Sequence, residues 1–311
     1  MLINLLVLLT ICISKPLTAD IYDFLKKIQE KPTIPKMKNI DYIYMINLDQ
    51  RPEKYQLCID QLQPYGITPY RFSAINGWEL TSATIDQLGV KYESTQSNDH
   101  WGTYYPLNSN EMAQFERLHV VGRTYFCHVM PKGSIGIVLS HLSILKDAYE
   151  SGYETIWVME DDIEVIRNPH LLSQYIEDLD ALVGKNGWDI LFTDQDTKGQ
   201  DGHYVICNSY AWRPNFTPDN PYKFAERTDL NKTFRKIGAR YGAYSMIIRR
   251  SGIIKLLDFF KHYQIFLPYD MEYTLPQNMR FICLKEDIVS TQPQGLTDNA
   301  HPNYKKKAFK D

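Results

Sequence analysis

The segment 42–52 reads YIYMINLDQRP and decides the fold of the chain around it. Its first five residues form an unbroken apolar run, which is typical of a central parallel strand covered on both faces. A polar turn follows, and Pro52 suits the first turn of a helix that extends to about Tyr65 and ends at Gly66. Residues 68–74 predict a second strand. The order strand, helix, strand predicts a parallel α/β sheet.

The same alternation returns later in the chain, between two stretches with weak patterning. Residues 93–130 are expected to form an insertion or a long loop, and residues 194–235 are polar and irregular. The remaining pattern predicts helices over 134–151, 171–183 and 250–260, and strands over 155–159, 188–192, 241–248 and 281–284. We therefore expect an α/β fold with a mainly parallel central sheet flanked by helices.

Composition excludes several classes of protein. The chain has 311 residues, of which 44% are apolar, with 37 acidic against 34 basic side chains. That balance excludes a disordered chain, and a net charge of -3 gives no basic footprint for a nucleic acid polymer. The predicted organisation is a leader over residues 1–19, a linker over 20–39 and one catalytic domain over 40–311.

Residues 1–19 resemble a secretory signal peptide or a membrane-anchor-like segment. The apolar run from Leu2 to Ile13 is too short to span a bilayer comfortably, and Ala19 is a small residue suited to a cleavage site. A functional leader would place the protein in an export pathway, in a secretory lumen or on a membrane through its N-terminus. Without one, we expect the cytoplasmic face of a membrane. A buried N-terminal strand or helix is the alternative.

The cysteines beyond the leader are widely spaced and give little guidance. No C-x-x-C spacing occurs, which disfavours zinc and thioredoxin-like redox sites. In an exported chain, one or two disulfides are an option, and four separate buried thiols are the other. The residues concerned are Cys58, Cys127, Cys207 and Cys283.

The sharpest chemical signal is the triplet Glu160, Asp161 and Asp162, which directly follows a buried strand. Adjacent carboxylates repel one another, and the carboxyl end of a parallel strand faces the crevice where α/β proteins bind ligands. Oxygen ligands of this kind suit Mg²⁺ or Mn²⁺. A solvated turn leading into the next helix is the bland alternative, and spacing alone does not separate the two.

Two further groups of residues are candidates on weaker grounds. Ser140 and His141 lie in an otherwise apolar helix, where a lone histidine is more often structural, and adjacent helical residues do not face one another. Asp270 and Glu272 lie in a loop between a helix and the last expected strand. Either carboxylate suits a general base, and either suits a surface turn equally well.

Taken in their order along the chain, these residues and the blocks around them resemble glycosyltransferase family 25. That family includes lipopolysaccharide and lipooligosaccharide sugar transferases and the collagen galactosyltransferases. The resemblance covers roughly residues 40 to 300, judged as one domain. Lys54 departs from the family, which often has arginine there, and residues 93–130 and 194–235 match no block. The matching blocks are Ile46 to Arg51 with Arg71 to Gly77, Gly133 to His141, Glu160 to Asp162, and Gly242 to Ser245 with Pro268 to Asp270, then Gln292, Thr297 and Asp298.

The resemblance implies a GT-A-like fold and inverting transfer of a sugar, with galactose expected, from a nucleotide donor such as UDP-galactose. The acceptor would be a hydroxyl of a glycan, glycolipid or protein, as in lipopolysaccharide biosynthesis. Manganese is the expected metal, with magnesium as the alternative. By similarity, Asn47, Leu48, Arg51, Ser140, His141, Glu160 and Asp161 would bind the donor, with His141 near the diphosphate, and Asp162 with Glu160 would hold the metal. Asp270 would be the catalytic base, with Glu272 as its substitute.

Two rival classes stay open at this point. One is a non-catalytic carbohydrate-binding protein on the same fold, which the lysine at position 54 favours. The other is a metal-dependent sugar-phosphate hydrolase, which would use the same acidic triplet.

Overall fold

The computed structural model describes residues 20–96, 99–108, 111–199, 201–292 and 297–307, so the expected leader at 1–19 lies outside the described residues. The opening strand, helix and strand are confirmed. They are β1 (Tyr42–Asn47), α1 (Pro52–Leu62) and β2 (Tyr70–Ser73), and β1 and β2 pair in parallel. A 3-10 turn, η2 (Gln63–Tyr65), extends α1 to Gly66, whose φ of 66° ends the helix as expected.

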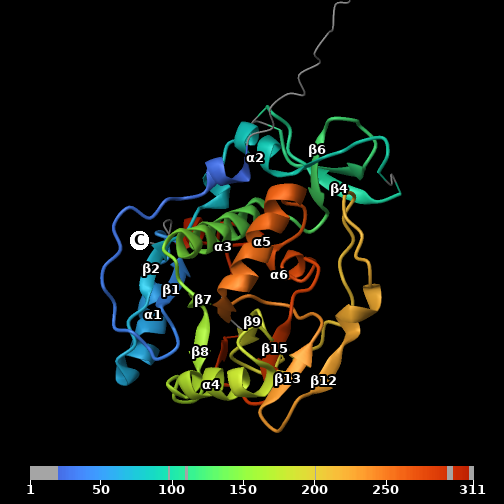
Figure 1. The fold of residues 1–311 in the computed structure, drawn as a ribbon. Helices are drawn as coiled ribbons and strands as arrows, with labels where there is room; N and C mark the ends of the chain where they lie inside the picture. The colour runs from blue at the N-terminus through green and yellow to red at the C-terminus, as the bar shows by residue number, and fades with distance from the viewer. Residues whose placement is uncertain (1–19, 97–98, 109–110, 200, 293–296, 308–311) are drawn as a thin grey trace, which may run out of the picture.

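Within the described residues, the main sheet has eight strands in the order β12-β13-β15-β9-β14-β7-β1-β2 (Figure 1). The pairings make β14 and β13 run opposite to all the others, so the sheet is mainly parallel in direction, as the pattern predicts. The other bounds are β7 (Thr155–Glu160), β9 (Ile190–Phe192), β12 (Arg227–Asp229), β13 (Phe234–Ile237), β14 (Ser245–Arg249) and β15 (Phe281–Leu284).

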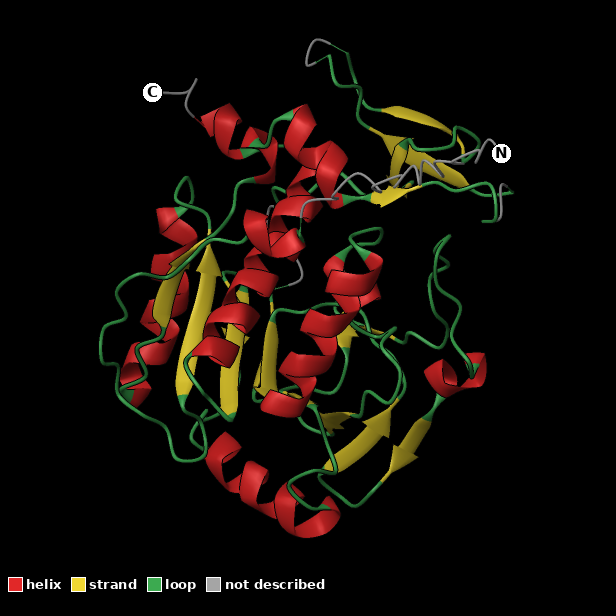
Figure 2. Ribbon diagram, turned by 45° about the horizontal axis from the view of Figure 1, so that its top comes forward, coloured by secondary structure: helices red, strands yellow, loops and turns green. Residues whose placement is uncertain are grey.

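Helices cover the sheet and complete the α/β architecture. Helices α3 (Lys132–Glu150) and α5 (Arg250–Tyr263) lie side by side across one face (Figures 1 and 2). Most of the α3 side chains are buried, because this helix contacts both β1 of the sheet and the neighbouring helix α5. The remaining helices are α2 (Ser82–Leu88), α4 (Leu171–Val183), α6 (Tyr269–Glu272) and α7 (Tyr304–Lys307), with 3-10 turns η1 (Ile21–Phe24), η3 (Gly77–Glu79) and η4 (Pro221–Ala225).

Of the two expectations for residues 93–130, an insertion or a long loop, the long loop is wrong. This region contributes strands to a small antiparallel sheet, ordered β3-β6-β4-β5, which lies beside the main sheet (Figure 2). Its strands are β3 (Val90–Lys91), β4 (Trp101–Tyr104), β5 (Gln114–Arg117) and β6 (Thr124–Cys127). The β4 and β5 strands are short, β4 is only partly buried and β5 is mostly exposed, so they lack the apolar alternation that marks a strand in a sequence.

The C-terminal part also differs in detail from the expected pattern. Strand β15 is not the last, because β16 (Val289–Thr291) follows it and pairs with β8 (Ile163–Val165) directly after the acidic triplet. Two short strands, β10 (Thr197–Lys198) and β11 (Tyr204–Val205), form a hairpin in the irregular region. The expected loop around Asp270 forms the single helical turn α6.

The cysteines answer one of the open questions. The four cysteines among the described residues are all free and buried, which favours the option of separate thiols over disulfides. Burial raises the pKa of the Cys58, Cys127 and Cys283 thiols to about 12, so these thiols are unreactive at neutral pH. None of the helices in the described ranges is long and apolar enough to cross a membrane.

Candidate active site

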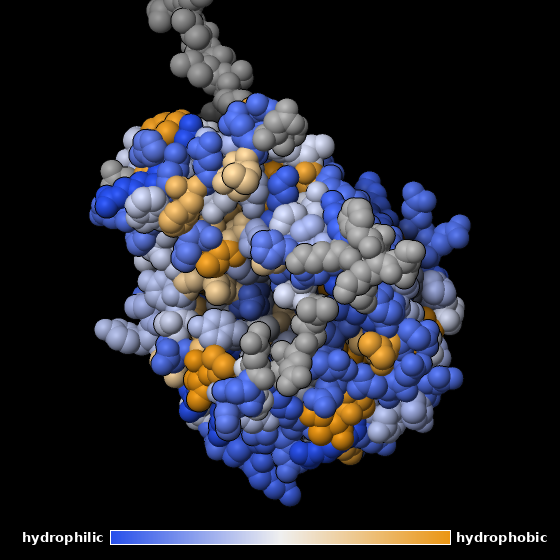
Figure 3. Space-filling view, turned by 180° about the vertical axis from the view of Figure 1, so that it is seen from behind, coloured by the Kyte–Doolittle hydropathy of each residue, from blue (hydrophilic) through white to orange (hydrophobic). Residues whose placement is uncertain are grey.

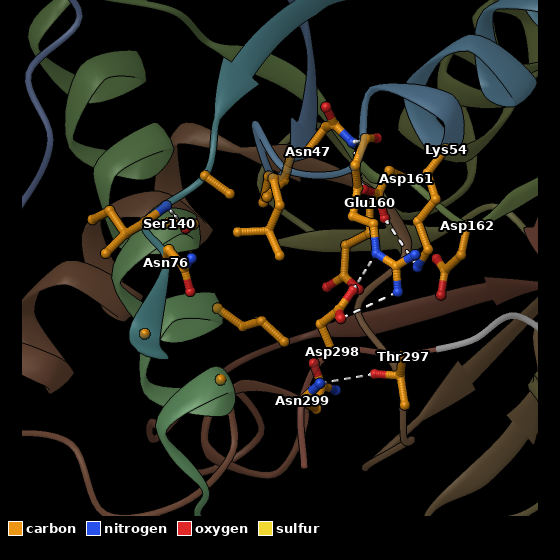
Figure 4. Close-up of a pocket in the computed structure, with 18 of the residues that line it drawn as sticks. Asn47, Lys54, Asn76, Ser140, Glu160, Asp161, Asp162, Thr297, Asp298 and Asn299 are labelled. Atoms are coloured by element: carbon orange, nitrogen blue, oxygen red, sulfur yellow. Dashed lines mark hydrogen bonds and ion pairs between the residues drawn. The ribbon is translucent and has the colours of Figure 1, made fainter. Parts of the chain in front are cut away.

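A polar pocket lies at the carboxyl ends of β2, β1 and β7. Ile46 of β1 pairs with Glu160 of β7, and Asn47 pairs with Ser73 of β2, so three strand ends meet at one edge of the sheet. The pocket is lined by residues 46–48, 74–78, 160–162 and 297–299, with Arg51, Lys54, Gly133, Ile137 and Ser140. Figure 4 shows the acidic triplet with Asn47 and Lys54 along one side, with Ser140 and Asn76 across the pocket.

Asn47 organises one end of the pocket through its side-chain amide. The Asn47 Nδ2 donates to Asp161 Oδ2 at 2.6 Å and to the Arg51 carbonyl at 2.8 Å, while its Oδ1 accepts from Arg71 Nε at 2.8 Å. Lys54 Nζ lies 3.7 Å from Asp161 Oδ1. Asn47 and Asp161 therefore hold the turn after β1 against the turn after β7. Lys54 adds a positive charge to the pocket wall.

Asp162 is the least compensated of the three carboxylates. Its Oδ1 is buried and has no hydrogen-bond partner among the described residues. Burial, with the charges of Glu160 and Asp161, raises the pKa of Asp162 to about 7. An unpaired buried carboxylate oxygen is costly to hold unless a cation or a proton compensates it.

Glu160 is held by His141, which the family resemblance implies to lie near the donor diphosphate. The His141 Nε2 lies 2.8 Å from Glu160 Oε1, and the imidazole stacks on the Tyr269 ring with centroids 4.1 Å apart. His141 is buried and is not among the residues that line the pocket. The structure therefore places His141 behind Glu160, where it orients that carboxylate. Ser140 does line the pocket.

Ser140 and two glycines set the opposite wall. The Ser140 Oγ donates to the Gly136 carbonyl at 2.7 Å and accepts from the Ile75 N–H at 2.8 Å, which joins α3 to the segment after β2. A Cβ at Gly136 would lie 2.4 Å from the Ile75 carbonyl oxygen and 2.5 Å from the Gly77 nitrogen. Only glycine at position 136 allows α3 to approach η3 this closely.

The segment 297–299 closes the pocket, and its role was missed in the sequence. Arg51 forms a bidentate ion pair with Asp298, with Nε–Oδ2 at 2.7 Å and Nη2–Oδ1 at 3.1 Å. The Trp78 indole N–H donates to the Asp298 carbonyl at 2.7 Å. Arg51, expected to contact the nucleotide, is buried and anchors this segment. The only sequence signal was Thr297-Asp298 within a matching block, which gave no hint of the partner.

Asp270 does not line this pocket. The Asp270 Oδ2 accepts from the Gly242 N–H at 3.0 Å, and Gly242 has a φ of 77° that favours glycine. Burial, together with the charge of Glu160, raises the pKa of Asp270 above its usual range. Asp270 lines a separate small cavity with Arg240, Tyr241, Cys207 and residues 209–211. It is thus a carboxylate of raised proton affinity beside the triplet.

Glu272, the expected substitute base, occupies a different environment. Its side chain is fully buried, pairs with the buried Arg213 and accepts from the Phe266 and Leu267 N–H groups at 3.3 Å each. Burial raises the pKa of Glu272 to about 7. With both oxygens engaged inside the protein, Glu272 is positioned to join α6 to the loop that carries Arg213. Of the two carboxylates, Asp270 is therefore the better placed to act as a base.

The residues present fit a divalent ion only in part. No group of three His, Cys, Asp or Glu side chains within the described ranges is arranged to hold a metal by itself. The unpartnered Asp162 Oδ1, next to Glu160 and Asp161, is nevertheless the kind of anionic oxygen that Mg²⁺ and Mn²⁺ bind. One or two carboxylates together with substrate phosphates are the usual ligands of such an ion, and this donor set fits that arrangement.

Comparison with known proteins identifies what the chain is similar to. The model of glycosyltransferase family 25, described as a lipopolysaccharide biosynthesis protein family, matches residues 40–273. That match includes the strand ends, the acidic triplet and Asp270.

The relatives include proteins with different names. A glycosyltransferase 25 family member of Aedes aegypti is 26% identical over 179 residues, covering 57% of this chain and 25% of the relative. The human inactive glycosyltransferase 25 family member 3 is 28% identical over 159 residues, covering 51% of this chain and 22% of the relative. A Drosophila melanogaster family member is 26% identical over 45% of this chain and 19% of the relative. The chain thus spans a quarter or less of these curated relatives.

Proposed function

The chain belongs to glycosyltransferase family 25, and on that premise we propose that it is an inverting hexosyltransferase. It would move a sugar, with galactose from UDP-galactose as the first candidate, to a hydroxyl of a glycan, glycolipid or protein. The observation that carries this proposal is the position of Asp270. It lies beside the acidic pocket, within the electrostatic reach of Glu160, and lines a second cavity of its own.

The donor would lie in the pocket at the strand ends. Lys54 on the wall, and the N–H groups at the start of α3, supply positive charge for a diphosphate. Asn47 and Arg51 would act by holding the walls, because their side chains are already engaged with Asp161 and Asp298. Glu160, fixed by His141, would accept a hydrogen bond from a hydroxyl of the ribose or the sugar.

Asp162 would hold a divalent ion, with Glu160 as the second carboxylate in reach. When bound, the ion would supply Lewis-acid stabilisation of the leaving diphosphate. Asp162 itself would then remain ionised. The positive charge of the ion would offset the cost of burying the carboxylate, which raises the Asp162 pKa when no ion is bound. Manganese is the expected ion, and magnesium is the alternative.

Asp270 would take the proton from the acceptor hydroxyl. Its raised pKa makes it a stronger base than an ordinary aspartate, and the Gly242 N–H fixes its orientation. Inversion requires the acceptor to attack the anomeric carbon from the face opposite the leaving group. A base in a cavity separate from the diphosphate pocket is consistent with that requirement.

A second candidate function is carbohydrate binding without transfer. Several similar proteins are named inactive, among them the human relative. Lys54 offers a point charge where arginine would offer a bidentate contact with phosphate. Against this candidate, the acidic triplet and Asp270 are both intact.

A panel of nucleotide sugars with Mn²⁺ separates these functions. The purified protein is incubated with each donor, with and without a mixture of acceptor glycans, and products are resolved by mass spectrometry. Sugar transfer to a glycan supports the proposal. Cleavage by water alone would point to a hydrolase, and donor binding without any product would point to the non-catalytic candidate.

A further inference from the structure

The two segments that match no sequence block meet at one place in the fold. The His100 ring, just before β4, stacks on Trp212 from the irregular region, with centroids 3.5 Å apart and planes 20° from parallel. Trp212 in turn packs edge-to-face with Phe266, with ring centroids 5.9 Å apart. The small sheet and the 207–216 loop are therefore joined by packed aromatic rings above α6.

These rings, with a second aromatic pair, line a cavity that we call the aromatic groove. Trp101 of β4 and Phe115 of β5 stack with centroids 4.9 Å apart, yet they are 47% and 56% exposed. Trp212, His100 and His128 complete the groove, which has a volume of about 620 Å³. Figure 3 shows a hollow in this face of the molecule, with apolar side chains gathered along its upper rim. Exposed aromatic faces at a hollow of this size are typical of a ligand site.

The groove leads towards the candidate base. Ala211 and Met271 line both the aromatic groove and the small cavity that contains Asp270. The Asp270 carboxylate also interacts with the charges of His141 and of Glu160, which lines the acidic pocket. A ligand held in the aromatic groove would therefore lie next to the cavity that contains the candidate base.

We propose that the aromatic groove binds a saccharide, and that this saccharide is the acceptor of the transfer. Its role as acceptor rests on the proposed transferase function. A pyranose ring has an apolar C–H face that stacks on an aromatic ring, and a rim of hydroxyls that needs polar partners. The groove supplies both, because His100, His128 and Asp99 stand among the aromatic side chains. An acyl chain would leave those polar groups facing hydrocarbon, which is unfavourable. Trp101 and Phe115 are the specificity-determining side chains.

Saturation-transfer NMR on the full chain tests the saccharide site without any donor. Lactose, cellotriose and maltotriose are the probes, each at millimolar concentration. We expect saturation of the ring protons of at least one sugar with wild-type protein. The variants Trp101→Ala and Phe115→Ala should weaken that binding at least tenfold, while Tyr222→Ala, which removes an 86% exposed ring outside the groove, should not. Thermal unfolding of each variant confirms that it is folded.

The outcomes separate failure of this site from failure of the proposed function. Sugar binding that depends on Trp101, in a protein that transfers nothing, would keep the saccharide site and remove the transferase. In an active protein, both variants should raise the acceptor KM at least tenfold while the donor KM stays the same. Transfer with an unchanged acceptor KM in both variants would overturn the proposal, as would absence of saturation for all three sugars.

Discussion

At the scale of single residues, the proposed mechanism relies on two carboxylates whose negative charge is poorly compensated by the protein. Asp162 has a buried oxygen without a partner among the described residues, and Asp270 accepts from the Gly242 N–H and is influenced by the charge of Glu160. Burial raises both pKa values, and such shifts are common where carboxylates do chemistry. Each residue therefore gives a prediction that separates a functional role from a structural one.

Asp162→Asn should lower Mn²⁺-dependent turnover on the order of 100-fold or more, because the amide cannot replace the anionic oxygen. The melting temperature should stay the same or rise, since the variant removes a buried charge. Asp178→Asn, an exposed aspartate on α4, is the matched control. Full turnover in Asp162→Asn would remove this residue from the metal site.

Asp270→Asn should lower kcat by roughly 10² to 10⁴, the usual contribution of a general base, and leave the donor KM unchanged. In the wild type, kcat/KM should rise with pH as Asp270 ionises. Because the Asp270 pKa is raised, the inflection should lie above the ordinary value of 3.8. Steady-state kinetics from acidic to neutral pH measure both. An unchanged kcat in the variant would give the base role to another group.

At the scale of elements, the sequence predicts the repeated strands and helices well and the small sheet poorly. Strand β1 and helix α3 carry strong apolar patterns because both lie inside the core. Strands β4 and β5 carry no such pattern, because they contact solvent on most of their length. The strand-end location of Asn47 and Glu160 follows from parallel topology, whereas the Arg51–Asp298 pair joins residues 247 apart and has no local signal.

Gly136→Ala tests how α3 is held against η3. The added Cβ would lie 2.4 Å from the Ile75 carbonyl oxygen, so the helix must move away from the pocket wall. We expect a loss of about 1–3 kcal/mol in the free energy of unfolding and weaker binding of a UDP-sugar. Glu150→Ala, at the exposed end of the same helix, should change neither. Chemical denaturation and calorimetry give the two quantities, and wild-type values in Gly136→Ala would contradict the proposed close packing.

Glu272→Gln tests the pair that joins α6 to the 207–216 loop. The buried Arg213 would lose its counter-charge, and breaking such a pair typically costs about 3–5 kcal/mol. Replacing both partners, with Arg213→Met added, should recover part of that loss. Urea unfolding measures each variant. If Glu272→Gln unfolds like the wild type but loses turnover, then Glu272 acts in catalysis after all.

At the scale of the whole molecule, the nearly balanced charge hides a local excess of carboxylates. The net charge is -3, yet Asp162 and Glu272 are buried with pKa values raised to about 7. The sequence predicts the Asp162 cluster, because three consecutive acidic residues follow an apolar run. It does not predict that Glu272 faces Arg213, since that contact forms only when the loop packs on α6.

Stability should therefore fall as pH rises from about 4 to 7 in the absence of metal. A carboxyl with a raised pKa binds more protons when folded than when unfolded. Its contribution is complete below the unfolded pKa and is lost as pH rises through the folded value. Asp162 contributes at most about 1.4 kcal/mol for each pH unit across that window. Asp162→Asn should flatten this slope in unfolding measurements. An equal slope in both proteins would contradict the burial of a titrating Asp162.

The most direct measurement is the stereochemistry of transfer from UDP-α-galactose. Wild-type protein is incubated with Mn²⁺, the labelled donor and an acceptor glycan, and the anomeric configuration of the product is read by NMR, with Asp270→Asn in parallel. The account predicts a β-linked product from the wild type and almost none from the variant. An α-linked product, or labelled galactose released only to water, would contradict it.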